Sequence, residues 1–262
     1  MDGGSERREA DASMDLAEYA KMAAVEDSMW WYRALHRNML SMLRRFGSEA
    51  GAEILDAGCG TGGLLKFLRR EQPGHHYQGL ELHGAACPLA HERAGVAVTH
   101  GSVNELPFAG ASLDVILSTN VLEQRGVEPG KAAAEAWRCL RPGGLYLVSE
   151  SALSWLRSYH DRRVGVERRF TRRELGEILA GAGFDIAYAS YWNSVLFPLV
   201  VLRRKVFSSE QSESDVGEYS RPVEMVFDGA IALERVWQNA GGTFPFGVSV
   251  MMAAIKPEGG RL

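Results

Sequence analysis

The chain has 262 residues, 46% of them hydrophobic and 24% charged, with a formal net charge of −4. Its length suits one α/β domain with additions or two small domains, and its composition is that of a globular protein. A negative net charge disfavours nucleic-acid binding, which requires a positive field along the phosphates. The three cysteines are odd in number and widely spaced, which disfavours a disulfide framework or a metal site and suits a reducing cytoplasm.

The N-terminal part divides into two segments. Residues 1–14 are polar, carry mixed charge and contain no apolar core, so we expect a disordered tail rather than a signal or transit peptide. Residues 15–47 have a helical pattern that breaks near Asp27 and Ser28, and Ser28 is a candidate cap for the second helix. That helix has an apolar side too broad for a simple surface helix, formed by Trp30, Trp31, Tyr32, Leu35, Met39, Leu40, Met42 and Leu43.

Two interpretations of this broad apolar side remain open. In the first, the helix packs on the main sheet, with Trp30 and Leu35 as core residues. In the second, the helix is a lid over a ligand, and the contacts come from Trp31, Tyr32, Arg33 and His36. The second interpretation is favoured because charged groups such as Arg33 would be unfavourable on a wholly dry side.

A glycine-rich turn joins a predicted strand over residues 52–57 to a predicted helix over residues 61–70. The strand is indicated by a short apolar run, and the helix by leucines and a phenylalanine at helical spacing. Gly58 and Gly60 lack a Cβ atom, so the backbone of the turn can approach a ligand closely and can take positive φ. The start of the helix then presents free N–H groups to that ligand.

The next predicted strand, residues 76–82, contains Glu81 about 20 residues after Gly60. A carboxylate at the end of the second strand is placed to accept hydrogen bonds from the two hydroxyls of a ribose. A nicotinamide dinucleotide and S-adenosylmethionine both carry such a ribose, so Glu81 alone does not distinguish them. Asp56, directly before the glycine turn, makes the turn differ from the GxGxxG pattern of dehydrogenases.

The chain continues with alternating helices and strands. We expect helices at 84–94 and 129–140, and strands at 96–100, 114–119 and 144–150. Such alternation predicts a parallel, doubly wound sheet with right-handed crossovers. Ligands in these sheets bind at the carboxyl ends of the strands. Four polar residues converge on that edge, namely Asp56, Glu81, Ser102 and Asn120.

Three later runs complete a recognisable series. They are Gly101-Ser-Val-Asn-Glu-Leu-Pro-Phe108, Ser112-Leu-Asp-Val-Ile-Leu-Ser-Thr-Asn-Val-Leu-Glu-Gln124 and Leu140-Arg-Pro-Gly-Gly-Leu145. Together with Asp-Ala-Gly-Cys-Gly-Thr-Gly at 56–62, they resemble the motifs of class I S-adenosylmethionine-dependent methyltransferases over about residues 52–150. Two residues depart from the family pattern: Ser102 stands where many relatives have an acid, and Gln124 where they often have histidine.

The resemblance implies an α/β, Rossmann-like, doubly wound sheet of seven strands whose last strand is antiparallel. It implies S-adenosylmethionine as the cofactor, with Glu81 on the ribose and Ser102 with the Val103 N–H on the adenine. Arg33 of the lid would meet the carboxylate of the methionine part. The residues expected to bind the cofactor are Asp56, Gly58, Cys59, Gly60, Glu81, Leu82, Ser102, Val103, Asn120, Trp31 and Arg33.

The methyltransferase domain is expected to span residues 48–262, with substrate-side insertions at about 151–173 and 193–240. The first insertion is rich in arginine, and we interpret this run as a solvated face, or as one from which one or two arginines meet a substrate anion. Its arginines are Arg157, Arg162, Arg163, Arg168, Arg169, Arg172 and Arg173.

The rest of the C-terminal part completes the expected domain. Thr171 and Glu174 form a predicted capping box that opens a helix over residues 171–182, and a strand should follow at 184–192. Residues 195–202 are apolar but too few to span a membrane, so they pack inside, line an apolar pocket or lie on a membrane surface. A mobile loop over 208–220, a helix over 222–239 and a final strand over 247–255 then close the fold.

The sequence thus predicts an enzyme that transfers a methyl group to a small-molecule acceptor by in-line displacement. The expected partners exclude nucleic acid and stable membrane insertion, while the oligomeric state stays open. An Asn/Asp-Pro-Pro-Tyr/Phe motif is absent after the fourth strand, which disfavours methylation of a DNA base or a glutamine amide. A base is required only if the acceptor must lose a proton. The candidate bases are His36, His160 and Tyr32.

Two other functions remain as alternatives. The chain could bind S-adenosylmethionine or S-adenosylhomocysteine without methylating, as a regulatory protein or as a catalyst of another reaction. It could also be an NAD-dependent oxidoreductase, although Asp56 before the glycine turn disfavours this.

Overall fold

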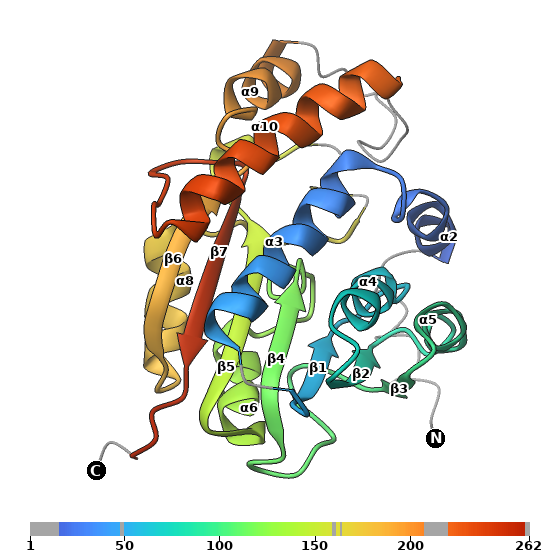
Figure 1. The fold of residues 1–262 in the computed structure, drawn as a ribbon, viewed down its shortest axis with the longest axis vertical. Helices are drawn as coiled ribbons and strands as arrows, with labels where there is room; N and C mark the ends of the chain where they lie inside the picture. The colour runs from blue at the N-terminus through green and yellow to red at the C-terminus, as the bar shows by residue number, and fades with distance from the viewer. Residues whose placement is uncertain (1–15, 48–49, 159–160, 163, 207–219, 260–262) are drawn as a thin grey trace.

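The computed structural model describes residues 16–47, 50–158, 161–162, 164–206 and 220–259. The expected tail at 1–14 and most of the expected loop at 208–220 lie outside these residues. A seven-stranded sheet in the order β3-β2-β1-β4-β5-β7-β6 forms the centre of the molecule (Figure 1). The strands are β1 (Glu53–Ala57), β2 (His76–Glu81), β3 (Ala97–His100), β4 (Leu113–Thr119), β5 (Leu140–Ser151), β6 (Asp185–Trp192) and β7 (Ser249–Ile255).

Strands β1 to β5 pair in parallel, whereas β7 enters between β5 and β6 and is antiparallel to both. The chain reverses at β1 in this order, since β2 and β3 lie on one side of it and β4 and β5 on the other. Ligands of doubly wound sheets bind at this switch point, at the carboxyl ends of the strands. The expected Rossmann-like fold with an antiparallel last strand is confirmed.

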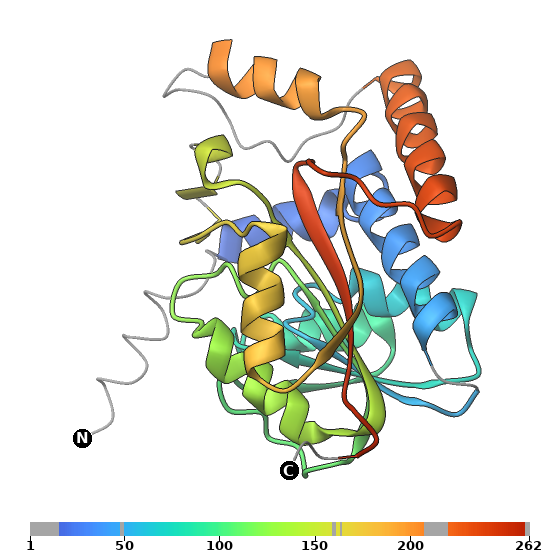
Figure 2. The ribbon, with the colours of Figure 1, turned by 90° about the vertical axis from the view of Figure 1, so that its left-hand side faces the viewer.

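Helices cover both faces of the sheet (Figure 2). On one face, α6 (Pro129–Cys139) and α8 (Arg172–Gly181) pack in the larger hydrophobic cluster, which holds Ala132 and Leu175. On the other face, α3 (Trp30–Phe46), α4 (Gly63–Glu71) and α10 (Arg221–Asn239) contribute to a second cluster. The remaining helices are α2 (Leu16–Val25), α5 (Cys87–Ala94) and α9 (Phe197–Val206), together with a short 3-10 helix at Ser154–Leu156.

Helix α3 is a wall of the sheet face. Nine of its 17 residues are buried, including Trp30 and Leu35, so the expected core positions of these two side chains are confirmed. The expected break before the helix is present, because α2 ends at Val25. The expected cap is wrong: Met29 is the N-cap, and the Ser28 hydroxyl instead donates to the Val25 carbonyl at 3.3 Å.

The arginine-rich segment after β5 is not uniformly solvated. Arg169 forms an ion pair with Asp161 at 2.6 Å, and both side chains are only 2% exposed. Arg169 also donates to the carbonyl of Ala152 at 3.0 Å. A solvated interpretation is therefore wrong for Arg169, because the buried carboxylate supplies the partner that a buried guanidinium needs. The capping box of Thr171 and Glu174 at the start of α8 is confirmed.

The apolar run at 195–202 is divided between the interior and the surface. Leu196 is buried, but Leu199 and Leu202 on α9 are each 49% exposed. Burial therefore does not account for the whole run, because one helix face must point outward. In the described part of the chain, every helix is too short or too polar to cross a membrane.

Candidate functional site

A cavity of about 610 Å³ opens at the carboxyl ends of β1, β2 and β4. Residues of α2, α3 and α9 complete its wall. The residues expected to bind the cofactor line this cavity with the exception of Arg33; they are Asp56, Gly58, Cys59, Gly60, Glu81, Leu82, Ser102, Val103, Asn120 and Trp31. Of the candidate bases, Tyr32 and His36 also line it, whereas His160 lies outside the described residues.

The turn between β1 and α4 needs its glycines. Gly58 has φ +91° and Gly60 has φ +55°, a region that residues with a side chain rarely adopt. A Cβ atom at Gly58 would collide with the side chain of Val121, and one at Gly60 would lie 2.9 Å from the Met22 Cε atom. The turn therefore brings bare backbone to the cavity, as a ligand that contacts the backbone requires.

Glu81 is held in place at the end of β2. Its Oε2 atom accepts from the Gly60 N–H at 2.9 Å, and its Oε1 atom accepts from the His83 N–H at 2.8 Å. The Tyr19 hydroxyl of α2 also donates to Oε1 at 2.8 Å. A ribose hydroxyl would donate the same kind of hydrogen bond to Glu81. The Tyr19 hydroxyl therefore occupies the oxygen atom with which Glu81 is expected to bind the cofactor.

Asp56 is a buried acid of the cavity with a raised pKa. Its side chain is 1% exposed, and its Oδ1 atom has no hydrogen-bond partner among the described residues. Burial, reinforced by the nearby carboxylates of Glu26 and Glu81, raises the pKa of Asp56 to about 8. A buried carboxyl oxygen without a partner fits a cationic donor such as the ammonium group of S-adenosylmethionine. The glycine turn, Glu81 and Asp56 thus fit this cofactor.

This environment predicts a linkage between cofactor binding and pH. A bound cation lowers the pKa of Asp56, so binding S-adenosylmethionine should release a proton near pH 7, and affinity should rise up to about tenfold per unit between pH 6 and 8. Because the pKa is raised in the folded state, the contribution of Asp56 to stability is fully present below its unfolded pKa and is lost as the pH rises towards 8.

Calorimetry in buffers of different ionisation enthalpy measures that proton. The variant Asp56→Asn keeps the shape of the side chain but does not titrate, so its affinity should be independent of pH. Binding by the wild type without proton release would contradict the assignment.

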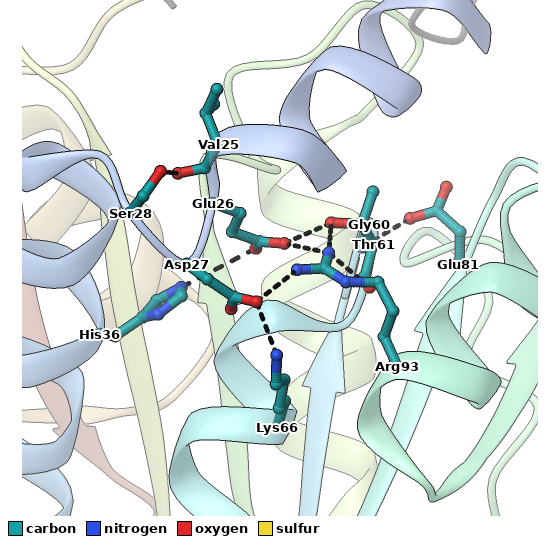
Figure 3. Close-up of polar contacts among 10 residues, drawn as sticks. All are labelled: Val25, Glu26, Asp27, Ser28, His36, Gly60, Thr61, Lys66, Glu81 and Arg93. Carbon is teal, nitrogen blue, oxygen red and sulfur yellow. Dashed lines mark hydrogen bonds and ion pairs between the residues drawn. The ribbon is translucent and has the colours of Figure 1, made fainter. Parts of the chain in front are cut away.

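A buried polar cluster ties the end of α2 to the core (Figure 3). Glu26 accepts hydrogen bonds from the Thr61 hydroxyl and from Arg93 at 2.7 Å. At the surface beside this cluster, the exposed neighbour Asp27 accepts from Lys66 of α4 at 2.6 Å. Sequence reasoning missed these residues, because nothing in their spacing shows that they meet across 35 and 67 positions. The cluster anchors the junction between α2 and α3 beside the glycine turn.

His36 is a weak proton acceptor in this environment. Its ring is buried, and its Nε2 atom lies 3.8 Å from Oε1 of Glu26. Burial lowers the pKa of His36 to about 4. The imidazole is therefore neutral at physiological pH, and a base of such low pKa contributes little to removing a proton.

Arg33 points away from the cavity. Its guanidinium pairs with Glu224 at 2.9 Å and with Asp228 at 2.6 Å, both on α10. The expected bond to the methionine carboxylate does not fit this arrangement, because two acidic side chains already hold the guanidinium. The sequence near Arg33 does not indicate this contact between helices, because both acidic partners lie in α10, nearly 200 residues away.

The remaining wall of the cavity contains both apolar side chains and arginines. Its apolar residues come from the segment after β5, from α9 and from the residue before β7, and include Val164, Val166, Val200 and Val248. Trp31 stacks on Trp192 at a centroid distance of 6.0 Å. In addition to Arg169, three arginines line the wall, namely Arg125, Arg203 and Arg204, and Arg204 donates to the carbonyl of Leu156 at 3.1 Å. The sequence analysis predicted an apolar pocket as one possibility for residues 195–202, but it assigned no role at this wall to Arg125, Arg203 or Arg204.

Comparison with known proteins gives matches at the levels of family, sequence and fold. Residues 55–148 match the family model described as a methyltransferase domain. A protein of Mycolicibacterium smegmatis named as an S-adenosylmethionine-dependent methyltransferase is 28% identical over 183 residues, which covers 67% of each chain. A fatty-acid O-methyltransferase of the same organism is 31% identical over 125 residues, which is 45% of this chain and 44% of that protein.

The fold match extends over nearly the whole chain. A structure of the Haloferax volcanii complex between the activator Trm112 and a methyltransferase aligns with a TM-score of 0.63 at 18% identity, covering 94% of this chain and 97% of that chain. Most curated relatives, in contrast, are matched over only about half of their length. These matches agree with the cofactor that the cavity fits. They do not identify the molecule that accepts the methyl group.

Proposed function

The chain belongs to the S-adenosylmethionine-dependent methyltransferases, and on that premise we propose that it methylates a carboxylate on an apolar small molecule. The observation that carries this proposal is the cavity wall, which joins an apolar lining to three arginines. An apolar lining suits a hydrocarbon body, and guanidinium groups favour an anion. The matched fatty-acid O-methyltransferase acts on a molecule of this kind.

The weak bases of the cavity also support a carboxylate acceptor. Bound S-adenosylmethionine supplies a methyl group on a sulfonium leaving group. A carboxylate is already deprotonated at neutral pH, so this acceptor needs no general base. His36, with its pKa lowered to about 4, would serve an alcohol or amine poorly. The chain then has to align the two reactants and exclude water from the methyl group.

A labelling assay tests the proposal. The protein is incubated with S-adenosylmethionine carrying an isotopically labelled methyl group and with fatty acids of several lengths, matched fatty alcohols and fatty amines. We expect labelled methyl esters, with S-adenosylhomocysteine formed in equal amount, and no product from the alcohols or amines. Label on an alcohol or amine, or binding of the cofactor without transfer to any acceptor, would refute the carboxylate assignment.

Two neighbouring residues of α9 provide a matched pair of variants. Val200 lines the cavity, whereas Leu199 is 49% exposed. Val200→Glu places a carboxylate in the apolar wall and should raise the KM for a fatty acid roughly tenfold or more, with little change in cofactor affinity. Leu199→Glu introduces the same group on the outside and should leave KM unchanged. An equal effect of both variants would show that α9 does not border the acceptor.

The lid of this enzyme is, in our proposal, α2 rather than α3. The burial of nine residues of α3 favours a fixed wall. Helix α2 is anchored at its end through Glu26, while Tyr19 nearer its start bonds to Glu81, the group expected to hold the ribose. A ribose and Tyr19 would compete for the Oε1 atom of Glu81, so cofactor binding would shift α2 about its anchored end.

Hydrogen exchange with and without S-adenosylhomocysteine tests this lid. We expect the exchange of amides in residues 16–25 to change on binding, while residues 35–43 of α3 stay equally protected in both states. The variant Tyr19→Phe removes the competing hydroxyl and should bind the ligand at least as tightly as the wild type. A change in α3 equal to that in α2 would show that the two helices move together, and an unchanged α2 would exclude the lid.

A further inference from the structure

Helix α10 has its charged side chains turned inward and its apolar side chains turned outward. Glu234 is buried and accepts from the Val195 N–H at 2.6 Å, while Glu224 and Asp228 pair with Arg33 of α3. Figure 2 shows α10 at the outside of the molecule, with no other described element beyond it. Five large apolar side chains on this outer side are 54–74% exposed, namely Met225, Val226, Leu233, Val236 and Trp237.

The outer positions of α10 have the same spacing whether the helix is read from its amino end or from its carboxyl end. Its positions 222, 226, 229, 233, 236 and 240 follow one another at alternating spacings of four and three residues, which is the spacing of a helix that packs on another helix. The pattern is symmetric about Ile231. In an antiparallel pair of identical helices, Val226 therefore lies opposite Val236, Gly229 opposite Leu233 and Met225 opposite Trp237.

We propose that this outer side of α10 is the interface of a homodimer with two-fold symmetry, in which the two α10 helices pack antiparallel. In the layer that joins Gly229 and Leu233, the absent side chain of Gly229 makes room for Leu233 of the partner subunit. A two-fold interface uses the same patch on both subunits, and a patch symmetric in sequence meets that condition.

Charge complements this pairing. Between Pro222 and Ala240, the exposed residues of α10 carry no charge, so no like charges meet across the interface. Arg221 at the amino end is exposed. In the antiparallel pair it lies beside the carboxyl end of the opposite helix, where the helix dipole favours a cation.

The area and the rest of the chain agree with a second copy as the occupant. Each of the five large side chains exposes an accessible surface on the order of 100 Å². Together they provide more than half of the about 800 Å² that a stable dimer buries per partner. The segments outside the structure do not match this surface in composition: residues 207–219 contain four acidic residues, and residues 1–15 are mainly polar. Neither supplies the row of large apolar side chains that would cover α10.

Sedimentation velocity tests the dimer over a range of protein concentrations. We expect a dimer for the wild type and, for Leu233→Glu, dimerisation weakened by about 100-fold or more, because the new carboxylate would be buried without a partner. Leu199→Glu makes the same change on the exposed side of α9 and should remain dimeric. A monomeric wild type, including one that binds lipid vesicles through this surface, or a dimeric Leu233→Glu variant, would overturn the proposal.

Cross-linking tests the antiparallel register independently of any charged variant. The double variant Val226→Cys with Val236→Cys places each cysteine opposite its counterpart in the second chain, so oxidation should give a covalent dimer. The double variant Val226→Cys with Leu233→Cys has the same number of new thiols, but they are not opposed, and it should cross-link much less. The wild type controls for the native cysteines, of which Cys87 is partly exposed. Equal cross-linking of both double variants would exclude this register.

Discussion

Replacing Gly60 by valine is expected to reduce the affinity for S-adenosylhomocysteine about 100-fold or more, a loss of roughly 3 kcal/mol. Gly60 has φ +55°, and its N–H group donates to Glu81 at 2.9 Å. A branched side chain disfavours this conformation and enters the space where the turn approaches the ligand. The change therefore disturbs both the backbone that faces the cofactor and the carboxylate expected to bind the ribose. Calorimetry or thermal-shift titration measures the loss.

Gly51 provides the matched control. It also has positive φ, at +91°, but a Cβ atom there would meet no other atom within 4 Å, and the residue does not line the cavity. Gly51→Val carries a similar backbone strain, so both variants should lose stability. Only Gly60→Val should lose the ligand. Normal binding by a folded Gly60→Val variant would show that this turn does not contact the cofactor.

The second large effect is expected for Glu81→Ala. Removing a charged acceptor of ribose hydroxyls should weaken binding by about 1.5 to 3 kcal/mol, or roughly 10- to 150-fold. The substitution also removes the group that binds the N–H groups of Gly60 and His83, so part of the loss comes from the turn. Titration with S-adenosylhomocysteine measures it.

Two further variants separate these contributions. Glu81→Gln keeps one acceptor oxygen and should lose less affinity than Glu81→Ala. Glu105→Gln removes an exposed carboxylate outside the cavity and should bind as the wild type does. If Glu81→Ala binds the ligand with unchanged affinity, the ribose is held elsewhere.

The position of most residues expected to bind the cofactor could be predicted from the sequence, because they follow strands at the carboxyl edge of a parallel sheet and line the cavity there. Asp56, Glu81 and Asn120 each follow an apolar run that indicates a strand, and the doubly wound topology brings such ends together. The glycines between β1 and α4 are local signals of the same kind. Local pattern and topology together thus suffice for this half.

The parts that could not be predicted depend on contacts between distant segments. Nothing local to Arg33 indicates that Glu224 and Asp228 will take its guanidinium, so its assignment to the cofactor does not fit the structure. The burial of Arg169 against Asp161 is equally hidden, since a run of arginines is normally solvated. Such pairings are set by tertiary packing, which periodicity and composition do not reveal.

The most direct test of the account is a crystal structure of the protein with S-adenosylhomocysteine. We expect the ribose hydroxyls within hydrogen-bond distance of Glu81, the amino group of the ligand facing Asp56, and the Tyr19 hydroxyl displaced from Glu81. The ligand sulfur should face the apolar wall that includes Val200. A ligand bound away from Glu81, or a sulfur atom directed away from this wall, would contradict both the cofactor site and the acceptor proposed for it.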